Sequence, residues 1–343
     1  MSPTSWGEPA AAPSPAPSPA PSPAGPAQRP TASSPAIHVV DLYKRYRRTT
    51  ALAGLSMTVE RGEVFGFLGP NGAGKTTTVK LLLGLARPTA GEALVLGAPA
   101  GDLEARRRIG YLPELFRFQS WLTAREVLKL HCRLLTLPRD RTAGPVGDVL
   151  DTVGLATRAD DKVGTFSKGM QQRLGLAVAL LGDPALVILD EPTSALDPVG
   201  RHDVRQVIRE LRDRGATVFL NTHLLAEAEQ VCDRVTVVDA GRSIATGSLD
   251  ELLGERTSVK LLVGGLHHRW WHDLSFFGNW SSDGRWARVD DVDPDRVPDL
   301  VRAIVGMGGR VEAVVPEHRS LEERFLELLG DRAPKKEEEA PAS

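Results

Sequence analysis

The residues whose types and spacing are best suited to chemistry begin with a glycine-rich run, Gly69-Pro70-Asn71-Gly72-Ala73-Gly74-Lys75-Thr76. The run fits Gly-x-x-x-x-Gly-Lys-Ser/Thr at every position. Its glycines let backbone amides converge on an anion, and the helix expected after it favours negative charge at its start. Lys75 adds a point charge, and the Thr76 hydroxyl is a ligand for Mg²⁺. The run therefore predicts a binding site for the β- and γ-phosphates of a nucleotide.

Two carboxylates and a histidine follow apolar segments further along the chain. Asp190 ends "ALVIL", which places it at the carboxyl edge of a sheet beside the phosphates, where it suits Mg²⁺. Glu191 comes next and can polarise an attacking water as a general base. His223 ends the next strand and can contact the γ-phosphate. The alternatives are a solvated acidic turn and a structural histidine.

A second phosphate-binding turn is indicated at "TFSKGMQQR", residues 165–173. Ser167 is expected to cap a helix whose free amides and dipole attract an anion, and Gly169 permits close approach. A plain helix cap explains "SKG" equally well when the segment is taken alone. A domain that already holds one complete phosphate site needs a reason for a second.

Alternating strands and helices are expected to position these residues. "AIHVVDLYKRYRRTTALAGLSMTVERG" alternates like antiparallel strands, and "EVFGFLG" is typical of a buried strand leading into the glycine-rich loop. A helix is predicted over Lys75–Leu85, and a mostly helical stretch over about 102–182. Strands return at "ALVILD", "ATVFLNTH" and "RVTVVDAG", with a helix around 199–213. This order predicts an α/β fold with a parallel sheet flanked by helices.

Composition narrows the class of protein. The 343 residues are 41% hydrophobic and 25% charged, which is typical of a globular chain with a substantial core. A net charge of −2 gives no general attraction to nucleic acid. Cys132 and Cys232 form no C-x-x-C pair, which favours a reducing cytoplasm. We find neither a secretion signal nor an apolar stretch near the roughly 18 residues of a membrane span. If the protein works at a membrane, another subunit supplies the spans.

Composition also changes along the chain. Near Thr257 the pattern changes to short strands, tryptophans and a final helix, "SLEERFLELLG", with a capping box at Ser320 and Glu323. The apolar face of that helix is Leu321, Phe325, Leu328 and Leu329. His268 and His272 are four residues apart, but packing tryptophans and exposed histidines explain "HHRWWH" better than a metal site. The expected units are a disordered Pro/Ala/Ser-rich tail (1–36), a nucleotide-binding domain (37–256), a small accessory domain (257–330) and a disordered tail (331–343).

The order of these motifs closely resembles that of ATP-binding cassette (ABC) ATPases over about residues 37–250. The glycine-rich loop is followed by "TFSKGMQQR", "LVILDEPTSALDP" and "NTH". The resemblance implies a P-loop NTPase fold, with a RecA-like core, an antiparallel β subdomain and a helical subdomain, followed here by a small α+β domain. In that family two cassettes pair head to tail, and each ATP lies between the P-loop of one and the signature turn of the other. The second phosphate turn would then serve the partner's nucleotide, and Ser194–Asp197 matches the D-loop that crosses to the partner.

The resemblance also assigns roles to single residues. Tyr46 is expected to stack on adenine, in preference to Tyr43. Glu114 stands where the family usually has the Q-loop glutamine, so it is expected to act at the Mg²⁺ and catalytic site with Asp190, Glu191 and His223. The signature turn reads "FSKGM" instead of "LSGGQ" but keeps Ser167 and Gly169. The expected ATP-binding residues are Tyr46, Gly69, Pro70, Asn71, Gly72, Ala73, Gly74, Lys75, Thr76, Thr77, Ser167 and Gly169, with Thr76, Asp190 and Glu114 at Mg²⁺.

"IGYLPE" resembles a branch of ABC-2-type exporters, in which the membrane subunit is a separate chain. The implied function is an ATPase that powers export through a polytopic membrane permease, as a peripheral protein at the cytoplasmic face of the cell membrane. The implied assembly is a homodimer or another paired cassette, with no nucleic acid. The alternatives are a soluble ABC ATPase acting on ribosomes or DNA, and a regulatory ATP sensor that hydrolyses little.

Overall fold

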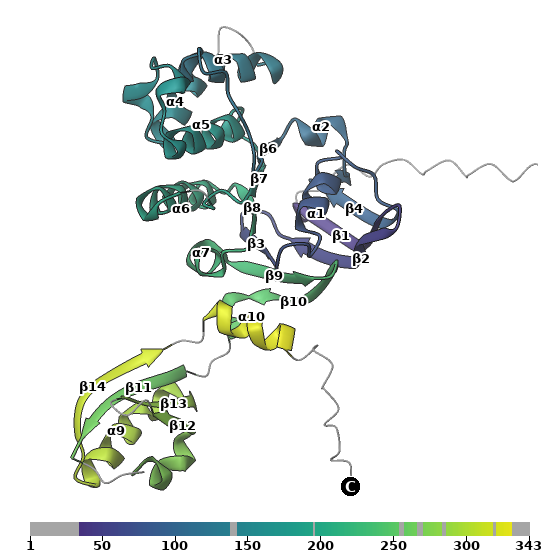
Figure 1. Cartoon of the computed structure of the whole chain (residues 1–343). Helices are drawn as coiled ribbons and strands as arrows, with labels where there is room; N and C mark the ends of the chain where they lie inside the picture. The colour runs from purple at the N-terminus through teal and green to yellow at the C-terminus, as the bar shows by residue number, and fades with distance from the viewer. Residues whose placement is uncertain are drawn as a thin grey trace, which may run out of the picture.

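Three β-sheets organise the chain in the computed structural model (Figure 1). The structure describes residues 34–137, 143–194, 196–253, 257–265, 270–282, 286–317 and 320–330. The predicted disordered tails, apart from residues 34–36, and His268 lie outside the described residues. The described residues therefore cover most of the two predicted folded domains, 37–256 and 257–330.

The first sheet is antiparallel, in the order β2-β1-β4-β5. Its strands are β1 (Ile37–Tyr46), β2 (Thr49–Val59), β4 (Ala90–Val95) and β5 (Ala98–Pro99). β1 and β2 form a hairpin in which Tyr46 lies opposite Thr49, so the predicted antiparallel pair is confirmed. Side chains of alternate residues are buried because neighbouring residues of a strand face opposite sides of the sheet.

The second sheet is mostly parallel, in the order β10-β9-β3-β8-β7-β6. Its strands are β3 (Val64–Leu68), β6 (Ile109–Leu112), β7 (Leu186–Asp190), β8 (Thr217–Thr222), β9 (Arg234–Asp239) and the antiparallel β10 (Arg242–Ser248). β3, β7 and β8 are buried along their whole length, as expected for parallel strands covered on both faces. The parallel sheet is confirmed, and β6 is an addition within the stretch predicted as mostly helical.

Helices cover this central sheet and build a separate lobe beyond its β6 edge (Figure 1). The lobe holds α3 (Ala124–Leu134), α4 (Ala143–Thr152) and α5 (Lys168–Leu180). The remaining helices of this part are α1 (Lys75–Leu82), α2 (Leu103–Arg106), α6 (Pro198–Asp213), α7 (Leu225–Val231) and α8 (Leu249–Leu253). Thr123 and Glu126 form a reciprocal capping box that fixes the start of α3.

The two faces of β3 show how the layers are joined. Val64 and Leu68 belong to a core that extends into the helical lobe and under α6 and α7. Phe65 and Phe67 face the other way, into a core shared with α1 and the antiparallel sheet. The two phenylalanines pack against Phe219 of β8, with ring centroids 6.1 and 5.4 Å apart. Burial on both faces holds the loops at the carboxyl ends of the strands in fixed positions, with each such side chain contributing about 1.5–3 kcal/mol.

The third sheet lies in the small C-terminal part, in the order β12-β13-β11-β14. Its elements are β11 (Thr257–Gly264), the 3₁₀ segment η4 (Trp270–Phe277), β12 (Asn279–Ser282), β13 (Trp286–Val292), α9 (Val297–Gly306) and β14 (Arg310–Glu317). Trp270 is buried here against Trp271 and Trp280, so the prediction that tryptophans pack in this region is confirmed. Among the described residues no group of three or more His, Cys, Asp and Glu side chains is arranged to hold a metal.

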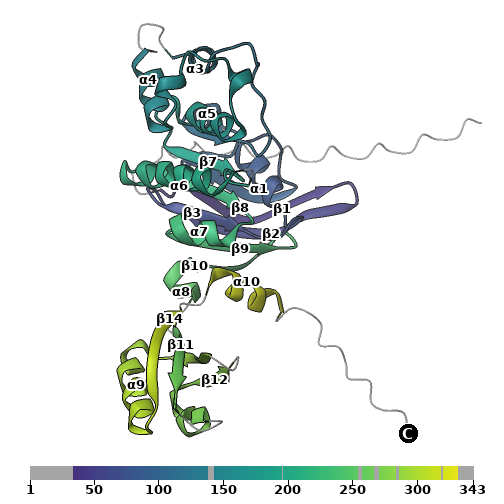
Figure 2. The ribbon, with the colours of Figure 1, turned by 60° about the vertical axis from the view of Figure 1, so that its left-hand side comes forward.

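The last helix, α10 (Leu321–Gly330), packs away from that sheet. Its predicted capping box is confirmed, because Ser320 and Glu323 exchange two hydrogen bonds of 3.2 Å. The helix contacts α7 and α8, and Leu321 is buried in the core shared by those helices. Figures 1 and 2 show it beside β10, above the small sheet. The boundaries 37–256 and 257–330 stay a prediction, with the last helix resting on the nucleotide-binding part. None of the helices described is long and apolar enough to span a bilayer.

Candidate nucleotide-binding site

The glycine-rich loop connects β3 to α1, as its spacing predicts. Gly69 needs to lack a side chain, because a Cβ atom there would lie 2.2 Å from the carbonyl oxygen of Val238. Gly74, at the start of α1, has φ of 104°, and a Cβ atom would lie 2.6 Å from the carbonyl oxygen of Ala51. The glycines therefore bring the loop close to the neighbouring strands and leave its amides free of side-chain cover.

Lys75 is the first residue of α1 and is buried, with its side chain folded back into the loop. Its Nζ donates hydrogen bonds to the carbonyl oxygens of Gly69, at 2.7 Å, and Pro70, at 3.3 Å. Burial lowers the pKa of Lys75, and the nearby carboxylates of Glu191, Asp190 and Glu114 oppose that shift. The lysine thus holds the loop in shape while its charge faces three acids.

A cavity of about 360 Å³ opens above the loop. Its lining includes the predicted residues Asn71, Gly72, Gly74, Lys75, Thr76, Thr77, Glu114, Asp190, Glu191 and His223. Three other residues of the glycine-rich loop do not line it: Gly69 and Pro70 contribute carbonyls to Lys75, and Ala73 is buried in the core. The structure thus brings the glycine-rich loop together with the predicted carboxylates and His223.

The same cavity includes residues that the sequence reading missed. Thr49, Thr50 and Ala51, at the start of β2, line it, as does Asn221. Asn221 is paired in register with Asp190 across the parallel strands β7 and β8. The signal for Asn221 was available, since it lies in the same strand end as His223 and parallel strands end at one edge. Ser194, predicted only to reach a partner, also lines the cavity.

Asp190 is only 2% exposed at the end of β7. The Nδ2 of Asn221 donates to its Oδ1 at 2.5 Å. Burial raises the pKa of Asp190, and repulsion from Glu114 and Glu191 adds to the rise, against the Asn221 hydrogen bond and Lys75. A cation would relieve this crowding. Thr76, Glu114 and Asp190 offer the oxygen ligands that Mg²⁺ prefers, with the rest of its shell left for water and phosphate.

Glu191 and His223 contact each other directly. Oε1 of Glu191 accepts hydrogen bonds from the His223 backbone amide, at 3.1 Å, and from its Nδ1, at 2.7 Å. Oε2 accepts one from the Thr222 hydroxyl at 3.2 Å. Glu191 also has a φ of 51°, a strained conformation that costs about 1–3 kcal/mol. The predicted general base is therefore held toward β8 by several donors, next to the predicted phosphate-contacting histidine.

The second turn lies elsewhere on the surface. Ser167 caps α5 as predicted, its Oγ accepting a hydrogen bond of 3.2 Å from the Met170 amide. A separate hollow of about 370 Å³ is lined by Ser167, Lys168 and Gly169 together with residues at the start of α6. As far as the structure describes the chain, no residue lines both this hollow and the cavity above Lys75. One chain does not bring its two phosphate-binding turns together.

Tyr46 lies at the rim of the phosphate cavity, at the end of β1. It is paired with Thr49, which lines the cavity, and its ring is exposed. The Nζ of Lys44 lies 4.7 Å from the ring centroid. Tyr43 instead places its hydroxyl against Gly54 of β2. The expectation that Tyr46 receives adenine stays a prediction; Tyr43 is about equally exposed, and what favours Tyr46 is its pairing with the cavity-lining Thr49.

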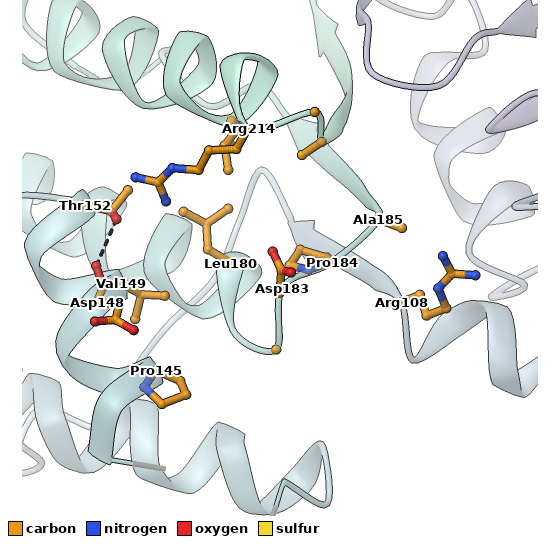
Figure 3. Close-up of a pocket in the computed structure, with 14 residues that line it drawn as sticks. Arg108, Pro145, Asp148, Val149, Thr152, Leu180, Asp183, Pro184, Ala185 and Arg214 are labelled. Atoms are coloured by element: carbon orange, nitrogen blue, oxygen red, sulfur yellow. Dashed lines mark hydrogen bonds between the residues drawn. The ribbon is translucent and has the colours of Figure 1, made fainter. Parts of the chain in front are cut away.

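A cavity of about 560 Å³, larger than the one above Lys75, lies at the opposite edge of the central sheet (Figure 3). It is lined by the residues that precede three strands, Arg108 before β6, Ala185 before β7 and Ala216 before β8. Ligands of open α/β sheets bind at the carboxyl ends of strands, which is the edge that carries Lys75 and Asp190. The nucleotide site is therefore the smaller cavity.

A glycine-rich loop before α1, carboxylates at the ends of parallel strands and a helical lobe define a P-loop nucleotide-binding protein. Residues 52–194 match the ABC transporter family. An uncharacterized ABC transporter ATP-binding protein of Nostoc sp. is 40% identical over 314 residues, 88% of this chain and 92% of that protein. The Nod factor export ATP-binding protein I of Rhizobium etli is 40% identical over 305 residues, 86% of this chain and 93% of its own. The chain belongs to the ABC transporter ATP-binding proteins.

A solved structure agrees with this assignment. The dimeric structure of an ATP-binding cassette in a post-hydrolysis state, bound to ADP and Pi, superposes with a TM-score of 0.57 at 26% identity. The match covers 62% of this chain and 98% of that one. The fold expected from the motifs, an ABC cassette of the P-loop NTPase class, is confirmed, and the protein is an ABC ATPase.

Proposed function

We propose that this chain is the ATP-hydrolysing subunit of an exporter at the cytoplasmic face of the cell membrane. In this proposal two cassettes pair, and a separate polytopic permease carries the substrate. The observation that supports pairing most directly is the separation of the two phosphate-binding turns. The cavity above Lys75 has carboxylates but no signature turn, and the hollow at Ser167 has an anion-attracting helix start but no lysine loop. A second copy turned head to tail completes both, and a homodimer is the simplest arrangement.

In the paired form, the phosphates of ATP bind the amides of residues 71–77 and the Lys75 ammonium, and Ser167 and Gly169 of the second copy close the site. When bound, Mg²⁺ neutralises charge on the phosphate oxygens, and Thr76, Asp190 and Glu114 are the residues that would hold it. Glu191 accepts a proton from the attacking water. For that step its Oε1 exchanges the His223 hydrogen bond for the water, and the released imidazole is placed to donate to the γ-phosphate.

Docking of the permease is supported by the loop that follows β6. Glu114 lines the nucleotide cavity, while its neighbour Leu115 is 86% exposed and Trp121, further along the same loop, is 69% exposed. Two large apolar side chains left exposed on one loop are consistent with an interaction site. The loop thus joins the nucleotide to a surface suited to membrane helices. Export, as opposed to import, rests on the similarity to the Nod factor export ATP-binding protein I.

The test uses a Glu191→Gln variant, which is expected to bind ATP without hydrolysing it. With ATP the purified variant should form a dimer by light scattering, and a Glu191→Gln/Lys75→Ala control should stay monomeric. Tagged Glu191→Gln should also be extracted from host membranes together with a polytopic protein identifiable by mass spectrometry. Recovery with ribosomes or DNA and without a membrane protein would overturn the exporter proposal.

A further inference from the structure

A group of basic residues surrounds the tip of the β1–β2 hairpin, which projects from the side of the cassette (Figure 2). We call it the basic rim, and it consists of Lys44, Arg45, Arg47, Arg48 and Arg87. The four arginines are exposed and Lys44 is half-buried. Such a local excess of positive charge is a distinct feature in a chain whose net charge is −2.

The basic rim lacks neutralising carboxylates. In the part of the chain that the structure describes, none of its five residues forms an ion pair. Lys44 Nζ donates to the carbonyl oxygen of Arg87 at 2.6 Å, and Arg45 Nε donates to that of Arg47 at 3.0 Å. β2 contains no acidic residue, and Asp41, the only one in β1, interacts with Ser56. The five positive charges are therefore not paired with any carboxylate of the described residues, and the four arginines are exposed.

The basic rim adjoins the nucleotide cavity. Arg47 and Arg48 form the turn between β1 and β2, and the next two residues, Thr49 and Thr50, line the cavity. Tyr46, on the other side of the turn, lies opposite Thr49. A nucleotide that reaches the phosphate loop past this hairpin therefore passes the unpaired arginines.

Most of the charged side chains that line the cavity are acidic, which disfavours the approach of an anion. Its lining has one lysine, Lys75, against three carboxylates, Glu114, Asp190 and Glu191. A nucleoside triphosphate carries net negative charge even with Mg²⁺ bound. Additional long-range attraction is therefore expected from cations outside the cavity, and those of the basic rim adjoin it.

We propose that the basic rim attracts nucleoside triphosphates electrostatically and so accelerates their association with the phosphate loop. The inference rests on the proposed function, because it assumes that ATP binds in this cavity. Charge of one sign at the mouth of a cleft concentrates an oppositely charged ligand and raises its association rate by about 10- to 1000-fold. Because exposed charges are screened by salt, the acceleration should weaken as the Debye length falls from about 10 Å at 0.1 M to about 3 Å at 1 M.

The test compares Arg47→Asn/Arg48→Gln with the wild-type chain. Asparagine suits the positive φ of 48° at position 47, so the turn should be preserved. Association of N-methylanthraniloyl-ATP with the protein, measured by stopped flow in the presence of Mg²⁺, should be about three- to tenfold slower at 0.1 M salt. This is at the low end of the effect of a whole charged cleft, because only two charges are removed. At 1 M salt the difference should be much smaller. The dissociation rate and kcat for ATP should be unchanged.

Two further variants make the result specific. Arg47→Lys/Arg48→Lys keeps the charges and should associate like wild type. Arg302→Gln/Arg310→Gln removes two exposed arginines from the small C-terminal part, one on α9 and one on β14. This variant should also associate like wild type. An equal loss in the lysine variant or in the distant variant would overturn the proposal, because the effect would then not arise from charge at the rim.

Other outcomes are equally decisive. An unchanged association rate in Arg47→Asn/Arg48→Gln, together with loss of binding to vesicles rich in anionic lipid, would overturn the proposal in favour of a membrane contact. If the wild-type chain neither bound nor hydrolysed ATP, the proposed function itself would fail. Normal ATP hydrolysis with an unaffected association rate would remove only the role of the basic rim.

Discussion

Replacing Leu321 by alanine tests how the last helix is held. Leu321 is 1% exposed and lies among buried residues of α7 in the core of the cassette, not among those of the small sheet. The change removes about three methylene equivalents, roughly 2.4 kcal/mol of transfer free energy at about 0.8 kcal/mol each. The cavity that remains adds to this, although partly buried Phe325 can move to fill some of it. We expect a loss of about 2–3 kcal/mol, at the lower end of the range for leucine to alanine.

Hydrogen exchange followed by mass spectrometry measures this loss segment by segment. A loss of 2–3 kcal/mol corresponds to opening that is about 30- to 150-fold more frequent, and exchange should accelerate by that factor in peptides covering α10. A smaller acceleration should reach α7, which Leu321 contacts and whose Glu229 accepts a hydrogen bond of 3.2 Å from the Leu321 amide. Local exchange is the suitable measurement because a chain with more than one folded unit need not unfold in a single step.

The matched control is Leu326→Ala on the same helix. Leu326 is 63% exposed, so its loss should change the free energy of opening by less than about 0.5 kcal/mol. The reasoning would be refuted if both variants exchanged alike. It would also be refuted if Leu321→Ala accelerated exchange in β11–β14 and left α7 unchanged, since the helix would then be anchored by the small sheet.

Three other predictions concern the nucleotide site. Burial raises the pKa of Asp190, so its charged form destabilises the folded chain at neutral pH, and this cost is absent below the ordinary pKa of 3.8. Asp190→Asn should therefore raise the Tm of the nucleotide-free protein at pH 7. A scanning-fluorimetry gain that did not shrink towards acid pH would contradict this. Tyr46→Ala should raise the KM for ATP about tenfold by loss of stacking, whereas Tyr46→Phe should leave it unchanged. A KM of Tyr46→Ala equal to that of the wild type would exclude stacking. Gly169→Ala, where the nearest atom would be 3.8 Å away, should fold normally but lose the ATP-dependent dimer; retained dimerisation on light scattering would count against the paired site.

The cassette was largely predictable because its local signals agree with one another. Continuous apolar runs marked β3, β7 and β8, which are buried on both faces. β6 was missed because "IGYL" is short, lies between two helical segments and becomes a strand only by pairing with β7. Placing "SLEERFLELLG" with the small domain followed its position in the sequence. Two residues of the predicted apolar face, Leu321 and Phe325, pack against the core of the cassette, but amphipathicity does not specify the surface that covers such a face.

The candidate site was predictable where a residue's chemistry is tied to a motif. Lys75, Asp190 and Glu191 were located by strand ends and glycine spacing. The direct contact between Glu191 and His223 was not foreseen, because it depends on the alignment of β7 with β8 and on the positive φ at Glu191. The unpaired charge of the basic rim also required the structure, since a sequence of arginines does not reveal where the nearest carboxylates lie.

The separation of the two phosphate-binding turns has a consequence for inheritance. If each complete site is shared between two copies, a chain defective at Lys75 and a chain defective at Gly169 should rescue one another. In a mixed pair, one site receives the intact loop of one chain and the intact turn of the other, and the second site carries both defects. Two alleles that are inactive alone would then give about half the number of working sites in each mixed pair. Two alleles defective at the same turn would give no complete site in any pair.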